Sequence, residues 1–516
     1  MIGNNVKTKD IVEFGDYQTP EDFVDKVCLY LKNNLNINPK YILEPTFGLG
    51  NFIKGSLKAF NNVDNIFGIE LNKKYYDYAS DEISKLHIMD NKVVLFNENI
   101  FNFDFNKIKS KINKTDSLLV IGNPPWVTNS ELTSMDSSNL PIKENFKGLS
   151  GLDAITGKGN FDIAEYIILQ LLNEFKDYNC YIAMLCKNIV AKNIVRDLEK
   201  YDFTLSEIKM LCFNANDVFN VSCEACLLIM KVGGKERLIC DVYDFNKPTK
   251  KIRMFGWTGG NFISDLGNYS QDIDGLCQLE WRQGIKHDCS KVMELTHSSK
   301  NEFTNGLKEK LHVEDDYIYP LLKSSDIKKY IIKDTRKYVI VTQRKVREET
   351  DSIKDKSPLL WNYLQEHSQL LDNRKSSIYK KAPRFAIFGV GDYSFKPYKV
   401  AISGFYKTPL FALVYNTIEK PIMLDDTCYF LGFDNYNHAL ITTLLLNSKI
   451  VQNFIKSIAF LDSKRPYTKD ILMRIDLLKV VENISFKDLI SIADNLKIEH
   501  NLINDDYIDF SNSLRN

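Results

Sequence analysis

The segment Asn123-Pro-Pro-Trp126 has the residue types best suited to chemistry in this sequence. It follows an apolar run, residues 117–121, which predicts a short buried strand that the two prolines end. It offers an amide side chain, carbonyl oxygens outside any strand ladder, and a flat ring at Trp126 that we expect to be exposed. Such a set could hold a planar amine by hydrogen bonds while the ring stacks on its face. A strand-ending turn with a core tryptophan is the alternative.

The elements that must position this segment alternate along the first 230 residues. Apolar runs predict strands at residues 41–44, 65–70, 92–96, 118–121 and 181–185, and amphipathic stretches predict helices at 22–35, 51–60, 73–85 and 163–174. This alternation predicts an α/β fold, a parallel sheet with helices on both faces. Strands at 208–213 and 224–230 could close the sheet in antiparallel fashion. Ligands of such sheets bind beyond the carboxyl ends of the strands.

A glycine turn, Glu44-Pro-Thr-Phe-Gly-Leu-Gly50, follows the first of these strands and opens a helix. Gly48 and Gly50 would let the backbone pass close to a ligand, and Glu44 could accept a hydrogen bond from an ammonium group. The turn is not a Walker loop, because no Gly-Lys-Ser/Thr follows, and it lacks the third glycine of the full dinucleotide fingerprint. A tight strand-to-helix turn without a ligand is the alternative.

Polar residues also follow the next two strands. Glu70 stands 22 residues after Gly48, a spacing at which an acid can bind ribose hydroxyls. The stretch 97–104, after the third strand, would bring a polar residue to the base of a bound ligand. Thr19-Pro20 before the first helix could add a hydroxyl to the same edge of the sheet. The strand ends thus carry, in order, a glycine turn, an acid, a polar residue and Asn-Pro-Pro-Trp. Together these four features indicate a ligand site more specifically than any one of them.

With these motifs in this order, the first 230 residues resemble the gamma group of S-adenosylmethionine-dependent N6-adenine DNA methyltransferases, which includes type II restriction-modification methylases. The resemblance implies a Rossmann-like methyltransferase sheet that binds S-adenosylmethionine. The cofactor residues that it implies are Thr19 and Pro20 near the methionine part, Glu44, Pro45, Gly48 and Gly50 in the first cofactor motif, Glu70 on the ribose, and Asn99 and Ile100 beside the adenine. The family commonly has aspartate where this chain has Asn99.

The same resemblance makes Asn123, Pro124, Pro125 and Trp126 the catalytic motif, with tryptophan where tyrosine is commoner. The Asn123 side-chain oxygen and the Pro124 carbonyl would each accept one hydrogen of the adenine amine. Its lone pair would then point at the sulfonium methyl for an in-line displacement that requires no metal. The adenine must leave the duplex, and Trp126 and Phe219 would stack on its faces. Phe161-Asp162 resembles a further motif of the family, and the polar stretch 127–158 could order over bound DNA.

Composition bounds these expectations. A chain of 516 residues with 44% hydrophobic and 26% charged residues predicts a globular protein of two or more domains. The ten scattered cysteines form no paired CxxC motifs, which favours reduced thiols in a cytoplasmic protein over zinc. Without an apolar run of about 18 residues or a signal-peptide core, we expect a soluble protein and no membrane partner. Net charge is zero, yet residues 321–410 hold 19 Lys+Arg against 9 Asp+Glu.

This basic stretch lies in a second half without strand–helix alternation. We expect a catalytic domain at residues 1–235 and a mixed α+β target-recognition domain at 250–516 that binds double-stranded DNA, with a linker between them. Segments 281–287, 319–326, 389–407 and 460–467 combine aromatic and basic residues that could contact DNA. We find no fused nuclease and expect a monomer, with any cognate restriction endonuclease encoded separately. The alternatives are a methyltransferase for RNA or for protein glutamine, and a DNA-binding subunit with weak or no catalysis.

Overall fold

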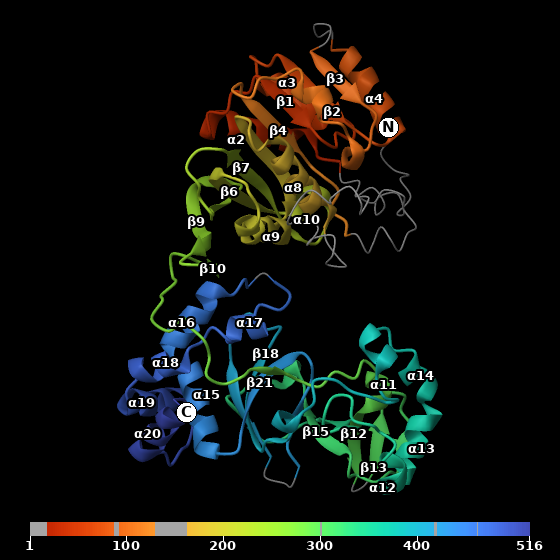
Figure 1. Cartoon of the computed structure of the whole chain (residues 1–516), viewed down its shortest axis with the longest axis vertical. Coiled ribbons are helices and arrows are strands. Elements are labelled where there is room, and N and C mark those ends of the chain that lie inside the picture. The colour runs from red at the N-terminus through yellow and green to blue at the C-terminus, as the bar shows by residue number, and fades with distance from the viewer. Residues whose placement is uncertain are drawn as a thin grey trace. The chain divides into compact units, whose positions relative to one another are not determined.

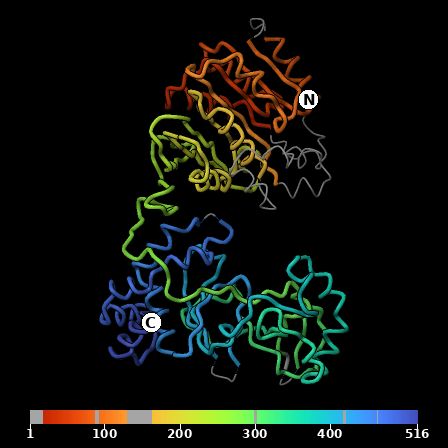
Figure 2. The backbone as a smooth tube through the Cα atoms, viewed as in Figure 1, coloured from red at the N-terminus to blue at the C-terminus, as the bar shows by residue number. Residues whose placement is uncertain are grey.

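The structure is a computed structural model that describes residues 18–86, 92–128, 162–299, 302–416, 420–461 and 463–515. It divides into two compact units, Met1–Gly267 and Asn268–Asn516, each a continuous stretch of chain (Figures 1 and 2). The predicted loop at 127–158 falls almost entirely outside the described residues, as does Phe161.

The first unit is built on one sheet of ten strands in the order β10-β9-β8-β6-β7-β5-β4-β1-β2-β3 (Figure 1). Its parallel part comprises β1 (Tyr41–Glu44), β2 (Asn65–Ile69), β3 (Val93–Phe96), β4 (Leu118–Gly122) and β5 (Cys180–Lys187). Next to β5 lies β7 (Glu224–Val232), followed by β6 (Leu205–Asn214), and β7 is antiparallel to both β5 and β6.

Helices connect these strands. They are α2 (Glu21–Asn34), α3 (Asn51–Ala59), α4 (Lys73–Ser84), α5 (Asn106–Lys109), α8 (Ile163–Phe175), α9 (Asn188–Asp197) and α10 (Ala215–Phe219). The crossover β1–α3–β2 and the crossover β4–α8–β5 run in opposite directions along the sheet. Because such crossovers are right-handed, α3 and α8 lie on opposite faces. The predicted Rossmann-like α/β fold is therefore confirmed.

The parallel register brings the predicted motifs to one edge of this sheet. Glu44 at the end of β1 pairs with Gly68 on β2, and Ile69 pairs with Phe96 at the end of β3. Leu43 pairs with Val120 on the other side, so β4 ends beside β1. The turns that follow these four strands consequently share one edge, where open parallel sheets bind ligands.

The sheet continues beyond β6. The strands β8 (Ile239–Asp244), β9 (Lys247–Thr258) and β10 (Asn261–Ile263) extend it, with β8 parallel to β6 and β9 antiparallel to β8. The stretch between residues 235 and 250, which we expected to be a linker, thus contains β8 and the start of β9. The predicted strand pair does not close the sheet, because β6 offers its free edge to β8.

The second unit has two sheets and a group of helices, the mixed α+β architecture that the sequence predicts. Its five-stranded sheet has the order β11 (Arg282–Gln283), β21 (Cys428–Phe433), β18 (Tyr398–Ser403), β19 (Phe411–Tyr415), β16 (Ile331–Ile332). Its six-stranded sheet has the order β14 (Lys310–Leu311), β13 (Glu302–Asn305), β12 (Glu294–Ser299), β17 (Lys337–Ile340), β15 (Ile318–Leu322), β20 (Met423–Leu424). The helices are α11 (Ser290–Met293), α12 (Ile353–Lys356), α13 (Pro358–Glu366), α14 (Ser368–Asp372), α15 (Tyr436–Leu446), α16 (Lys449–Ile458), α17 (Lys469–Leu472), α18 (Leu477–Asn483), α19 (Phe486–Leu496) and α20 (Asn504–Ser513).

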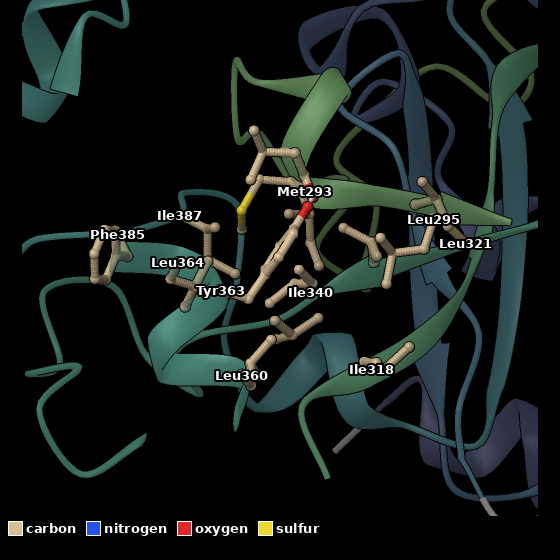
Figure 3. Packing of buried hydrophobic residues seen from close by; sticks show 14 of the residues in the cluster. Met293, Leu295, Ile318, Leu321, Ile340, Leu360, Tyr363, Leu364, Phe385 and Ile387 are labelled. Atoms are coloured by element: carbon tan, nitrogen blue, oxygen red, sulfur yellow. Dashed lines mark hydrogen bonds between the residues drawn. The ribbon is translucent and has the colours of Figure 1, made fainter. Parts of the chain in front are cut away.

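A hydrophobic core fixes the six-stranded sheet against α13 (Figure 3). Leu360, Tyr363 and Leu364 from this helix pack with Met293 and Ile340. The Tyr363 hydroxyl donates to the Val292 carbonyl oxygen at 2.8 Å, so the ring is buried with its polar atom satisfied. Within the described ranges, every helix is too short or too polar to cross a membrane.

Candidate active site

One cavity of the first unit, open to solvent and about 850 Å³ in volume, lies at the carboxyl ends of β1, β2, β3 and β4. Nine of the predicted site residues line it: Thr19, Glu44, Pro45, Gly48, Glu70, Asn99, Ile100, Asn123 and Pro125. The other five predicted residues are outside its described lining: Pro20, Gly50, Pro124, Trp126 and Phe219. Gly50 and Pro20 directly precede α3 and α2, where they set the direction of the chain.

The glycine turn joins β1 to α3 through two residues in left-handed backbone conformation. Gly48 has φ +52° and Gly50 has φ +76°, which glycine adopts at little cost. The Gly48 N–H donates to Glu70 Oε2 at 2.9 Å. A Cβ on Gly48 would lie 2.8 Å from Gln18 Oε1, which itself accepts from the Leu49 N–H at 3.1 Å. The turn is therefore tied to the end of β2 and to Gln18, a residue that sequence reasoning missed although it adjoins Thr19.

Glu70 holds the turn with one carboxylate oxygen and the next residues with the other. Its Oε1 accepts from the Asn72 N–H at 2.7 Å, while Oε2 accepts from Gly48. The Asn97 side chain donates to the Glu70 carbonyl oxygen at 2.8 Å. The Glu70 carboxylate thus lines the cavity while it is bonded to the backbone of Gly48 and Asn72.

Glu44 is a buried acid, 2% exposed, at the end of β1. Its Oε2 accepts from the Ile53 N–H at 3.0 Å. Burial raises the pKa of this carboxyl well above its usual value, and the negative charge of Glu70 raises the pKa further. The hydrogen bond from Ile53 and the charge of Lys54 oppose the shift. A cationic group placed in the cavity would stabilise the ionised form of Glu44.

Asn99 and Ile100 follow β3 in a short 3₁₀ turn, Ile100–Asn102. The Asn99 side chain accepts from the Phe101 N–H at 3.0 Å and so starts the turn. The Ile100 carbonyl oxygen accepts from Gln170 Nε2 at 3.0 Å. Gln170 lies inside the apolar run of α8, where no sequence signal marks it as part of the site.

Asn123 directly follows β4 and is held through both its side chain and its backbone. Its side-chain Nδ2 donates to the Thr19 hydroxyl at 3.3 Å, and its backbone oxygen accepts from the Thr46 hydroxyl at 3.5 Å. Thr19 in turn is fixed by Asn51, whose Nδ2 donates to the Thr19 carbonyl oxygen at 2.8 Å. Asn123 is therefore bonded directly to Thr46 of the glycine turn, and it shares Thr19 as a partner with Asn51 at the start of α3.

Trp126 is buried, only 4% exposed, so the prediction of an exposed ring is wrong. Its indole N–H donates to the Leu185 carbonyl oxygen on β5 at 3.4 Å. Its ring meets the Phe219 ring edge to face, with centroids 5.2 Å apart. Tryptophan becomes buried readily when its N–H finds an acceptor, and here the acceptor comes from the neighbouring strand. Phe219 closes α10 and is partly exposed.

Within the described ranges, no group of three His, Cys, Asp or Glu side chains is arranged to hold a metal ion. The cysteines are free thiols. Burial raises the pKa of Cys180, Cys226 and Cys240. Such thiols stay protonated and are poor nucleophiles. The polar side chains that line the cavity are carboxylates, amides and hydroxyls. Such a set binds a ligand through hydrogen bonds.

No family model matches the chain. The sequence is 41% identical to Type II methyltransferase M.NspV of Nostoc sp. (strain ATCC 29411 / PCC 7524) over 481 residues, which is 92% of this chain and 98% of that protein. Among solved structures, the chain is similar to the Type IIL restriction-modification enzyme MmeI in complex with DNA. The TM-score is 0.55 at 13% identity, over 99% of this chain and 76% of MmeI. This second likeness shows a common fold.

Proposed function

The chain belongs to the type II methyltransferase family, and on this premise we propose that it methylates N6 of an adenine that has left duplex DNA. The methyl donor would be S-adenosylmethionine, and the enzyme would be the modification component of a restriction-modification system. The observation that carries the proposal is the shared cavity. Asn123 and Pro125 lie on the same lining as Gly48, Glu70 and Asn99, so a nucleoside cofactor and a planar amine could meet there.

The residues of the cavity fit the proposed cofactor, which supplies an electrophilic methyl group on a sulfonium sulfur. Glu70 lines the cavity at the end of β2, and its carboxylate would accept from the ribose hydroxyls. Gly48 has no side chain to occupy the space beside it. Glu44 would accept from an ammonium group and thereby become ionised.

Asn123 and Pro124 would activate the amine. Its nitrogen is a weak nucleophile because the lone pair is delocalised into the ring. Two acceptors, the Asn123 side-chain oxygen and the Pro124 carbonyl oxygen, would each take one N–H and favour a tetrahedral nitrogen with its lone pair free. Positioning of this kind supplies much of the acceleration in displacement reactions, and no strong base is required. Asparagine at residue 123, rather than serine, favours adenine over cytosine as the target.

Trp126 and Phe219 would hold the target base. In the structure the two rings touch, so one of them must move before a base can lie between them. Trp126 is buried and bound to Leu185, whereas Phe219 is partly exposed. We therefore assign the movement to Phe219 and the fixed stacking surface to Trp126.

The second unit would recognise the DNA. Several of its guanidinium groups lie over aromatic rings. In three of these pairs the ring belongs to the predicted segment 389–407: Arg282 over Tyr393 at 4.8 Å, Arg344 over Phe395 at 4.0 Å and Arg465 over Phe405 at 4.9 Å from the ring centroid. A guanidinium held on a ring is oriented before it binds, which suits contacts to phosphates and guanine edges. We expect the enzyme to act as a monomer, with its cognate nuclease encoded separately.

The test is methyl transfer from labelled S-adenosylmethionine to duplex DNA, to RNA and to protein extract, offered separately. The proposal predicts label in DNA alone, and Asn123→Ala should abolish transfer while the affinity for S-adenosylmethionine stays within about threefold. Label that enters only RNA or protein would favour one of the other methyltransferases. Cofactor binding without transfer to any of the three would favour a DNA-binding subunit.

A further inference from the structure

Residues 373–391 of the second unit contain five Lys and Arg residues and no Asp or Glu, in a chain whose 67 Lys and Arg residues equal its 67 Asp and Glu residues. Four of these cations lie in residues 374–381, which we call the basic loop. The loop comes directly after α14 and the residues that end it (Figure 1), and its 3₁₀ turn, Ser377–Lys381, has no buried residue. It is therefore a local source of positive charge within a neutral chain.

Arg374 anchors the basic loop at its start. Its Nε donates to the Leu371 carbonyl oxygen at 2.7 Å, and its Nη1 donates to the carbonyl oxygens of Ala386 at 2.7 Å and of His287 at 3.2 Å. Its guanidinium group also lies over the Tyr379 ring, 3.7 Å from the centroid. Because three carbonyl oxygens and an aromatic ring hold this cation, it fixes the loop and is not available to a partner.

Tyr379 fixes the middle of the basic loop. Its hydroxyl donates to the Lys286 carbonyl oxygen at 3.2 Å, and its ring meets the Phe388 ring edge to face, with centroids 5.3 Å apart. Lys286 and Phe388 in turn exchange two backbone hydrogen bonds, of 2.8 and 2.9 Å. The acid beside Tyr379, Asp288, already has a cation, because its carboxylate lies 3.6 Å from Lys286 Nζ. A backbone held in this way needs little ordering when its side chains bind a partner.

The other three cations of the basic loop, Lys375, Lys380 and Lys381, are exposed. In the part of the chain that the structure describes, none of the three forms an ion pair or a side-chain hydrogen bond. The next cation along the chain differs, because Arg384 Nη2 donates to Asp372 Oδ2 at 3.3 Å. Exposed ammonium groups on an anchored backbone leave a concentrated positive charge, which a polyanion would neutralise.

We propose that the basic loop binds the phosphate backbone of duplex DNA through Lys375, Lys380 and Lys381. The identity of the polyanion rests on the proposed function, in which duplex DNA is the substrate. A lysine ammonium group is a point charge on a flexible stem, which suits a phosphate better than the paired acceptors of a guanine edge. Phosphate contacts carry no sequence information, so the loop would position the duplex, while other residues of the second unit select the target.

The experiment measures the binding of the full chain to a labelled DNA duplex by fluorescence anisotropy at several salt concentrations. Each phosphate contact contributes about 0.9 to the slope of log K against log salt concentration. The triple variant Lys375→Gln, Lys380→Gln and Lys381→Gln should therefore reduce this slope by about 2–3 and lower the affinity at least about tenfold at 0.1 M salt. The loss should be equal for duplexes with and without the methylated sequence, which methylation sequencing would map first. The kcat at saturating DNA should stay within about threefold of the wild-type value.

Two further triple variants are matched controls. Arginine in place of the three loop lysines keeps the positive charge, so the slope should stay within about 0.5 of the wild-type slope. Lys449→Gln, Lys456→Gln and Lys487→Gln remove the same charge from exposed lysines on α16 and α19. This second control should also change the slope by less than about 0.5, because the effect belongs to the basic loop and not to net charge.

An unchanged slope in the glutamine variant of the loop, or an equal fall in the control on α16 and α19, would overturn the proposal. A loss of affinity confined to duplexes with the methylated sequence would also overturn it, because that pattern belongs to residues that read base edges. If DNA is methylated and the slope is unchanged, this inference alone fails. If the loop variant behaves as expected and no methyl group is transferred to DNA, the proposed function fails and this inference stands.

Discussion

Replacing Gly48 with alanine should weaken cofactor binding while the first unit stays folded. The position has φ +52°, and an alanine in this left-handed conformation costs about 1 kcal/mol. The added Cβ would also lie 2.8 Å from Gln18 Oε1 and 2.9 Å from Gln18 Nε2. Gln18 must then move and lose its hydrogen bond from Leu49, which costs about another 1 kcal/mol. We expect a total loss of about 2 kcal/mol in the free energy of unfolding.

The sequence offers a matched control at Gly233. Its φ of +80° imposes the same kind of backbone strain, yet a Cβ there would meet nothing within 4 Å. Gly233→Ala should therefore cost about 1 kcal/mol, a fall of about 2–4 °C in the melting temperature of a unit of this size. Gly48→Ala should cost about twice as much. The difference between the two variants in free energy of unfolding measures the energetic cost of displacing Gln18.

Calorimetric titration with S-adenosylmethionine supplies the functional result. Because Gly48 lines the cavity and its N–H holds Glu70, we expect Gly48→Ala to lower the affinity at least about tenfold. Gly233→Ala should leave the affinity unchanged. If Gly48→Ala binds the cofactor as tightly as the wild type, the glycine turn does not contact it and the assignment of this cavity fails.

Two further predictions concern residues around the same turn. Since burial raises the pKa of Glu44 above its usual 4.5, its ionisation opposes folding, and the free energy of unfolding should fall as pH rises from about 4.5 toward the raised value. Glu44→Gln should lessen this pH-dependent fall, as urea denaturation at several pH values would show, and should weaken cofactor binding, as calorimetry would show. If the free energy of unfolding of the variant and of the wild type changed in parallel with pH, this prediction would be wrong. Gly68→Ala would place a Cβ 2.7 Å from Phe47 Cδ1 and 2.8 Å from Leu95 Cδ2. The overpacking should lower the free energy of unfolding by about 1–3 kcal/mol in a thermal or urea unfolding experiment. An unchanged midpoint would mean that Phe47 and Leu95 can move away from the added methyl group without loss of stability.

The sequence predicted the first unit well where the signal is local. Glu70 and Asn123 directly follow a strand, and Gly48 and Asn99 stand in the turns after β1 and β3, so strand–helix alternation was enough to place these residues at one edge of the sheet. Other features depend on partners distant in sequence. Trp126 is buried because its indole N–H meets the Leu185 carbonyl oxygen, and Gln170 reaches Ile100 across 70 residues.

In the second unit, even more of the structure depends on partners that are distant in sequence. Its aromatic and basic segments could be named from the sequence, but their strands are short and pair over long separations. In β15 and β20, for example, Leu321 pairs with Met423 in parallel, and each strand alone carries too few residues for a periodic pattern. Strands β8 and β9 were missed because Gly233-Gly234 before β8 and Lys247-Pro248 at the start of β9 are residue pairs typical of a linker.

The most direct test of the central claim is nucleoside analysis of DNA methylated by the purified enzyme. Duplex DNA that carries many sequences would be treated with the enzyme and S-adenosylmethionine, digested to nucleosides and analysed by mass spectrometry. The account predicts N6-methyladenine as the methylated product, and its absence from DNA treated with Asn123→Ala. Transfer that instead yields N4-methylcytosine or 5-methylcytosine, without N6-methyladenine, would contradict the roles assigned to Asn123 and Pro124.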